Sequence, residues 1–274
     1  MQFLHKTITT VKIATVVSGL NIIVYTTPAL SGNHDSTPQT HHSSPTAPAG
    51  NFRIPELTPR ERAVEALLNQ GLEKLSKQNM GGALIDFNEA ILTDPAHERA
   101  RIVRGDLLSQ MGEHPQAIDD YSQAIEQNPT FAFTYIRRGK AYEAVGNYKE
   151  AIEDYSEAID IYPEDGFGYA YRGGVYTKLG DNQKAMADLN KAIELNSGRA
   201  EAYLNRGNLY AKLADSKRGS EDYEEASSIY KKAMADYQQA AKLFSEQGHP
   251  VESQRAMTTM QTLKQRSVPA RAIN

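Results

Sequence analysis

Apolar residues recur at spacings of three and four along much of the chain, and short polar breaks separate these stretches. Between residues 132 and 165 the first stretch carries one such stripe, formed by Tyr135, Ile136, Gly139 and Tyr142. The second carries another, formed by Ala151, Ile152, Tyr155, Ala158 and Ile159. This period is that of an amphipathic helix. The break at Gly146-Asn147 and the stop at Pro163 therefore predict a short helical hairpin.

The same hairpin pattern repeats with a fixed period. Glycines follow one another at intervals of 34 residues, at Gly71, Gly105, Gly139, Gly173 and Gly207. Alanines stand twelve residues after the first four, at Ala83, Ala117, Ala151 and Ala185, and a large residue follows each, at Phe87, Tyr121, Tyr155 and Leu189. Prolines close three units, at Pro95, Pro129 and Pro163. Since one such hairpin cannot bury its own apolar faces, the units must stack on one another.

This pattern resembles the tetratricopeptide repeat, from about residue 64 to about residue 245. The resemblance implies an all-α, right-handed superhelical solenoid of five helix-turn-helix units and a C-terminal capping helix. We expect a repeat domain over 58–266, with units at about 64–97, 98–131, 132–165, 166–199 and 200–246, and a cap over 250–266.

Three local signals refine these boundaries. Thr58 and Glu61 form a capping-box pattern with Pro59 at the first helical position. In the first unit the break is Gln78-Asn79-Met80, and we expect asparagine to take the place of the usual left-handed glycine. The fifth unit holds 14 extra residues and keeps a helical stripe, so we predict one long helix over 220–246.

The N-terminal segment has the composition of an export signal. Residues 1–31 combine an early positive charge with an apolar run over 13–25, which is short for a membrane span. We expect a cleaved signal and a protein of the periplasm, thylakoid lumen or extracellular space. An uncleaved anchor formed by residues 13–25 and a cytoplasmic protein are the alternatives. Residues 32–57, rich in Ser, Thr, Pro and His, read as a disordered linker, and residues 267–274 read as a frayed tail.

Charge, cysteine content and motifs exclude several classes of function. The formal net charge of −4 gives no general attraction to nucleic acid, and the absence of cysteine excludes disulfides and thiolate metal sites. Catalytic motifs, phosphate-binding loops and metal-ligand spacings are absent from the sequence. We therefore expect a protein without catalytic activity, cofactor or metal.

Two charged series follow the repeat. An arginine precedes four of the glycines, at Arg104, Arg138, Arg172 and Arg206, and an aspartate precedes the large residue of each second helix, at Asp86, Asp120, Asp154, Asp188 and Asp236. The arginines could form a row of cations for an acidic ligand. The favoured interpretation is an ion pair that joins the two helices of each hairpin, because bidentate arginine–carboxylate geometry suits a half-buried interface.

The family resemblance also implies a binding groove lined by the first helices. Matched position by position, the inward residues are Phe133, Arg137, Lys140, Phe167, Tyr171, Gly174, Asn205 and Asn208. Aromatic side chains beside cations are typical of interface anchors, although Phe133 and Phe167 could equally pack between units.

We predict an interaction module or adaptor that binds a protein or peptide, used to assemble an envelope complex. The motifs resemble exported bacterial repeat proteins, including many from cyanobacteria. One alternative is a self-associating structural protein, a homodimer that uses the long helix through Tyr223, Ile229, Tyr230 and Tyr237. Another is a groove for a glycan or small molecule.

Overall fold

The computed structural model describes residues 57–218 and 223–266. The expected signal, nearly all of the expected linker, the first residues of the predicted long helix and the tail lie outside the described residues. The described part is helical throughout, with elements α1 Pro59–Ser76, α2 Met80–Thr93, α3 Glu98–Gln110, α4 His114–Gln127, α5 Ala132–Ala144, α6 Tyr148–Ile161, α7 Gly166–Leu179, α8 Asn182–Leu195, α9 Ala200–Lys217, α10 Tyr223–Glu246 and α11 Pro250–Arg266.

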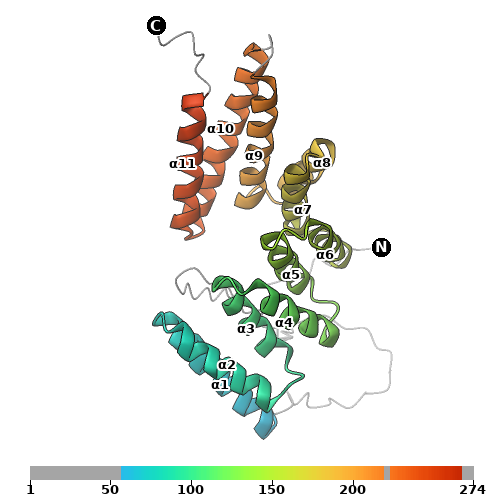
Figure 1. Ribbon diagram of the computed structural model, residues 1–274, viewed down its shortest axis with the longest axis vertical. Coiled ribbons are helices and arrows are strands. Elements are labelled where there is room, and N and C mark those ends of the chain that lie inside the picture. Colours follow the sequence, from blue (N-terminus) through green and yellow to red (C-terminus); the bar gives the residue numbers. More distant parts are fainter. Residues whose placement is uncertain (1–56, 219–222, 267–274) are drawn as a thin grey trace, which may run out of the picture.

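Consecutive helices pair into five hairpins, from α1–α2 to α9–α10, and the hairpins follow one another along the long axis of the molecule (Figure 1). Successive first helices also pack on one another, in the pairs α3–α5, α5–α7 and α7–α9. Elements on the inside of a curved stack approach each other most closely. The first helices therefore line the inner face of the superhelix, and the second helices lie outside.

Close packing of small on large residues holds each hairpin together. Gly139 faces Tyr155, and a Cβ added at this glycine would lie 2.7 Å from the Tyr155 ring. Gly71 meets Phe87, Gly105 meets Tyr121 and Gly173 meets Leu189 in the same way. The alanines of the repeat, at Ala83, Ala117, Ala151 and Ala185, are completely buried. The sequence period thus corresponds to one repeated core contact.

The helix ends confirm the capping box and correct one turn. Thr58 accepts a hydrogen bond from the Glu61 backbone N–H, and the Glu61 carboxylate accepts one from the Thr58 backbone N–H. In the first turn the left-handed residue is Gln78, with φ of 60°, and not Asn79. Asn79 caps α2 instead, because its side chain accepts a hydrogen bond from the Gly82 N–H.

The fifth hairpin consists of α9 and α10, with 18 and 24 residues, and α11 packs beside α10 (Figure 1). Tyr230 and Tyr237 are only 1% and 2% exposed, packed among α9, α10 and α11. These side chains therefore cannot form the self-association contact that the sequence suggested. The side chain of Tyr223 lies outside the described residues, and Ile229 is half-buried.

Candidate functional site

Four arginines join the two helices of their hairpins, as the paired-charge interpretation predicts. Arg138 donates from Nε and Nη2 to the two carboxylate oxygens of Asp154, at 2.9 and 2.7 Å. The same bidentate bond recurs in the pairs Arg104–Asp120, Arg172–Asp188 and Arg206–Asp236. The guanidinium charges are therefore already paired within the chain and do not form a free row of cations.

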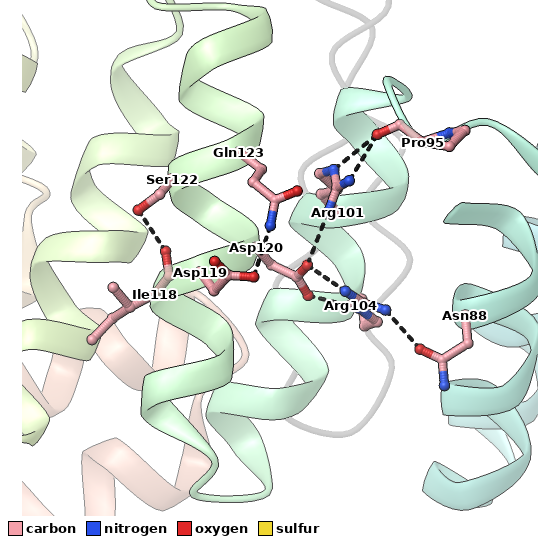
Figure 2. Close-up of polar contacts among 9 residues, drawn as sticks. All are labelled: Asn88, Pro95, Arg101, Arg104, Ile118, Asp119, Asp120, Ser122 and Gln123. Atoms are coloured by element: carbon pink, nitrogen blue, oxygen red, sulfur yellow. Dashed lines mark hydrogen bonds and ion pairs between the residues drawn. The ribbon is translucent and has the colours of Figure 1, made fainter. Parts of the chain in front are cut away.

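Each of these arginines also reaches the preceding unit. Its Nη1 donates to a polar side chain on the second helix of that unit, at 2.8–3.0 Å, in the pairs Arg104–Asn88, Arg138–Ser122, Arg172–Ser156 and Arg206–Asn190. Figure 2 shows this arrangement for Arg104, which lies between Asp120 of α4 and Asn88 of α2. One guanidinium thus bonds to two other helices, and it connects successive units as well as the halves of one unit.

In the first unit a lysine, and not an arginine, pairs with the aspartate of the second helix. Gln70 stands at the arginine position, and Lys74, one helical turn later, forms an ion pair of 2.7 Å with Asp86. The second carboxylate oxygen of Asp86 is buried without a hydrogen-bond partner in the structure. The ammonium of Lys74 therefore bonds to one carboxylate oxygen, whereas the guanidinium in each later unit bonds to both.

On the inner face, three of the predicted groove residues form one aromatic cluster. The rings of Phe133 and Phe167 meet edge to face at 5.8 Å, and Phe167 stacks on Tyr171 at 6.1 Å with planes 7° apart. The Arg199 guanidinium lies over Phe167, 3.3 Å from the ring centroid, and is held there by Asp165 at 2.5 Å. All three rings remain partly exposed, so they pack between α5 and α7 and still present surface.

Arg137 is paired rather than free. It forms an ion pair with Asp106 of the preceding unit at 2.9 Å, and the Tyr121 hydroxyl donates to the same carboxylate at 2.8 Å. Burial raises the pKa of the Asp106 carboxyl, and Arg137 and the Tyr121 hydroxyl oppose that rise. The sequence reasoning missed Asp106, although its place directly after Gly105 marks it as an inward residue of α3.

Lys140 is exposed beside the aromatic cluster. Its ammonium lies 5.1 Å from the centroid of the Tyr171 ring. The Tyr171 phenol raises the pKa of Lys140, and Glu201 and Asp106 raise it further. Among the predicted groove residues of α5 and α7, Lys140 therefore combines a positive charge with solvent access, next to partly exposed rings.

The remaining groove residues make contacts within the chain. Asn205 donates to the backbone carbonyl of Ala170 at 3.0 Å and lies directly over Gly174, where a Cβ would come within 2.9 Å of the amide. Asn208 accepts a hydrogen bond from the Tyr237 hydroxyl at 2.8 Å and remains exposed. Gly174 thus permits close approach of α9 to α7.

Other kinds of site are not evident in the described ranges. Within residues 57–218 and 223–266 the structure contains no group of three or more His, Asp or Glu residues arranged to hold a metal ion. None of the helices described is both long enough and apolar enough to cross a bilayer.

Family models match the repeated part of the chain. A model described as "Tetratricopeptide repeat" matches residues 132–165, a second with that description matches 200–232, and one described as "TPR repeat" matches 105–146 and 173–213. Comparison with curated proteins found no match.

Solved structures share the fold. MamA is 24% identical, with 63% of this chain and 96% of that one covered and a TM-score of 0.52. A thermophilic repeat protein of Thermus thermophilus is 20% identical, with 72% and 100% covered and a TM-score of 0.55. PilF of Pseudomonas aeruginosa is 19% identical, with 75% and 94% covered and a TM-score of 0.53. At these identities the likeness concerns the superhelical fold.

Proposed function

This chain is a tetratricopeptide repeat protein, and we propose that it binds a peptide or protein segment along its inner face. The family is generally a non-catalytic fold for protein interaction. The observation that carries the proposal is the partly exposed cluster of Phe133, Phe167 and Tyr171 beside the exposed residue Lys140.

The geometry favours a segment of defined chemistry. Partly exposed rings offer apolar area that is already ordered, so a partner loses little side-chain entropy on contact. The Lys140 ammonium, 5.1 Å from the centroid of the Tyr171 ring, adds an attraction for a carboxylate. The segment that fits best therefore carries an apolar or aromatic residue near an acidic one.

The cellular role belongs to the same proposal. An export signal at residues 1–31, followed by a tether over 32–57, would place the repeat domain outside the cytoplasm. There the domain would act as an adaptor that assembles an envelope complex. The support for this role is the sequence alone, because residues 1–56 lie outside the described part of the chain.

A photo-crosslinking residue at position 144 of the full-length chain tests the inner-face assignment in the host, because Ala144 is exposed one helical turn beyond Lys140 and its replacement keeps the ammonium. A matched crosslinker at Lys149, on α6 with its side chain 85% exposed, is the control on the outer side of the same hairpin. We expect position 144 to capture a partner that position 149 does not. The captured segment should then bind Lys140→Glu at least about tenfold more weakly than the parent chain. Equal capture at both positions, or unchanged affinity for Lys140→Glu, would contradict the proposal.

A further inference from the structure

A cavity of about 560 Å³ opens between α2, α3 and α4, on the side of the second helices. It is lined by Leu84, Asn88, Arg104, Leu108, Pro115, Gln116 and Asp119. None of these belongs to the predicted groove residues, so the cavity is separate from the inner face.

The repeat explains why the cavity exists. Leu108 stands where the next three units carry Tyr142, Tyr176 and Tyr210, at intervals of 34 residues. In two of those units the ring lies beside the repeated arginine, with Arg138 5.9 Å from the Tyr142 centroid and Arg206 6.0 Å from the Tyr210 centroid. Leucine is too short to fill the same space, and the volume beside Arg104 stays open.

The second tyrosine of this arrangement is also missing. Tyr135 and Tyr203 lie on the other side of Arg138 and Arg206, at 5.7 and 5.6 Å. At the corresponding place beside Arg104 the chain carries Arg101, which bonds to the Pro95 carbonyl and lies 3.6 Å from Asp120 (Figure 2). Arg104 therefore has no aromatic ring beside it at either of the two positions, which hold Leu108 and Arg101.

The lining matches a phenol ring. Leu84, Leu108 and Pro115 supply apolar walls, and the Arg104 guanidinium is fixed by its bonds to Asp120 and Asn88. A planar guanidinium held in this way stacks on an aromatic face. Asp119 is exposed at the rim and can accept a hydrogen bond from a phenolic hydroxyl.

Exposed apolar residues beside the cavity indicate that the ring comes from a protein. Ile85 and Leu92 of α2 are 65% and 81% exposed. The next two units carry carboxylates at these places, Asp119 and Glu126, then Glu153 and Asp160. An apolar strip on this one outer helix offers contact area for the residues that flank an inserted side chain.

We propose that this cavity binds a tyrosine side chain of a partner protein, with its ring stacked on Arg104 in the place that the chain's own tyrosines take in later units. The proposal concerns the outer side of the first two units and stands independently of binding at the inner face.

The first experiment uses p-cresol, the side chain of tyrosine, as the probe. We titrate it into the full chain labelled at leucine methyl groups and follow the NMR signals. We expect saturable shifts at Leu84 and Leu108 with a dissociation constant of about 1 mM. Leu108→Tyr should fill the cavity, weaken the response of Leu84 at least about tenfold and raise the melting temperature. Leu179→Tyr, which adds the same ring at an exposed position of α7, is the control and should leave p-cresol binding unchanged.

The second experiment distinguishes a protein partner from a free aromatic molecule. Peptides are selected from a random displayed library on the immobilised chain and eluted with excess p-cresol. We expect tyrosine-containing peptides whose binding is lost in Leu108→Tyr and weakened in the double variant Ile85→Asp, Leu92→Glu, which retains p-cresol binding. The proposal fails if p-cresol shifts other residues, if Leu108→Tyr lowers the melting temperature and keeps the response, or if the double variant binds the peptides as well as the parent chain.

Discussion

Gly139 of α5 lies against the ring of Tyr155 of α6, and a methyl group at this glycine would be 2.7 Å from the ring carbon Cε1. The contact brings the two helices of the third hairpin together at a point where both residues are buried. The ring cannot withdraw freely, because its hydroxyl donates to Glu143 at 3.0 Å and its face stacks on Tyr171 at 5.6 Å.

We therefore expect Gly139→Ala to lower the free energy of unfolding by about 1–3 kcal/mol, since an overpacked core must shift backbone or rotamers. Chemical denaturation measures the change. Gly81→Ala is the control, because this helical glycine has open space around its Cβ position and should gain up to about 1 kcal/mol. Equal effects of the two substitutions would contradict the packing argument.

The pair Arg138–Asp154 predicts a non-additive result. Arg138→Leu leaves a carboxylate that is 5% exposed without its cation, and the expected loss of stability is about 3–5 kcal/mol. Adding Asp154→Leu removes the stranded charge, so the double variant should be more stable than Arg138→Leu alone. A thermal double-mutant cycle measures the coupling free energy, and additive losses would show that the two side chains do not depend on each other.

Gln78 predicts a stabilising substitution. Its φ of 60° is left-handed, and three later units carry Gly112, Gly146 and Gly180 with φ of 83–86° at the equivalent turn. Gln78→Gly relieves the steric cost of the side chain and should raise the free energy of unfolding by up to about 1 kcal/mol. The reverse change, Gly146→Gln, should destabilise the chain. If Gln78→Gly destabilises the chain instead, the turn does not hold the strained conformation.

The raised pKa of the Tyr230 hydroxyl predicts that the folded state loses stability at alkaline pH. Burial raises the pKa of its hydroxyl to about 12, and the hydrogen bond to Asp215 contributes. An unfolded tyrosine loses its proton near pH 10. The contribution of Tyr230 is therefore complete below about pH 10 and is lost as the pH rises to about 12, because the unfolded state releases the proton first.

Urea denaturation at several pH values across this window measures the slope. Tyr230→Phe has no proton to release and retains every lysine of the parent chain, so its stability should fall less steeply over the same range. Parallel curves for the two proteins would exclude a role for this hydroxyl.

Much of the hairpin architecture follows from residues that recur in phase. The glycine, alanine and large residues identify one core contact, and the arginine and aspartate series identify one ion pair, because the same side chains return every 34 residues. The sequence pattern did not predict the bond from each arginine to the preceding unit, because its acceptor is not the same residue type in every unit. The acceptors of the third arginine bond are asparagine at two boundaries and serine at the other two, at Asn88, Ser122, Ser156 and Asn190.

The candidate site shows the same limit. A position-by-position match locates the inward residues of α5 and α7, but it does not show that Arg137 is neutralised by Asp106 or that Asn205 contacts the Ala170 carbonyl. Those contacts depend on how closely one first helix approaches the next. Tyr237 packs on Gly207 as the repeat predicts, but the burial of Tyr230 also involves α11, whose position against α10 is a tertiary contact without a periodic signal.

The arginine that bonds to the preceding unit has a consequence for the way the array comes apart. In a linear array, the balance between the stability of each unit and the strength of each boundary decides whether units open singly or in blocks. A charge-assisted hydrogen bond crosses each of the four boundaries between the five units and makes the contact between neighbouring units more favourable. Opening at one end therefore exposes a severed guanidinium at the next boundary, and we expect hydrogen exchange to register several hairpins opening as one cooperative block.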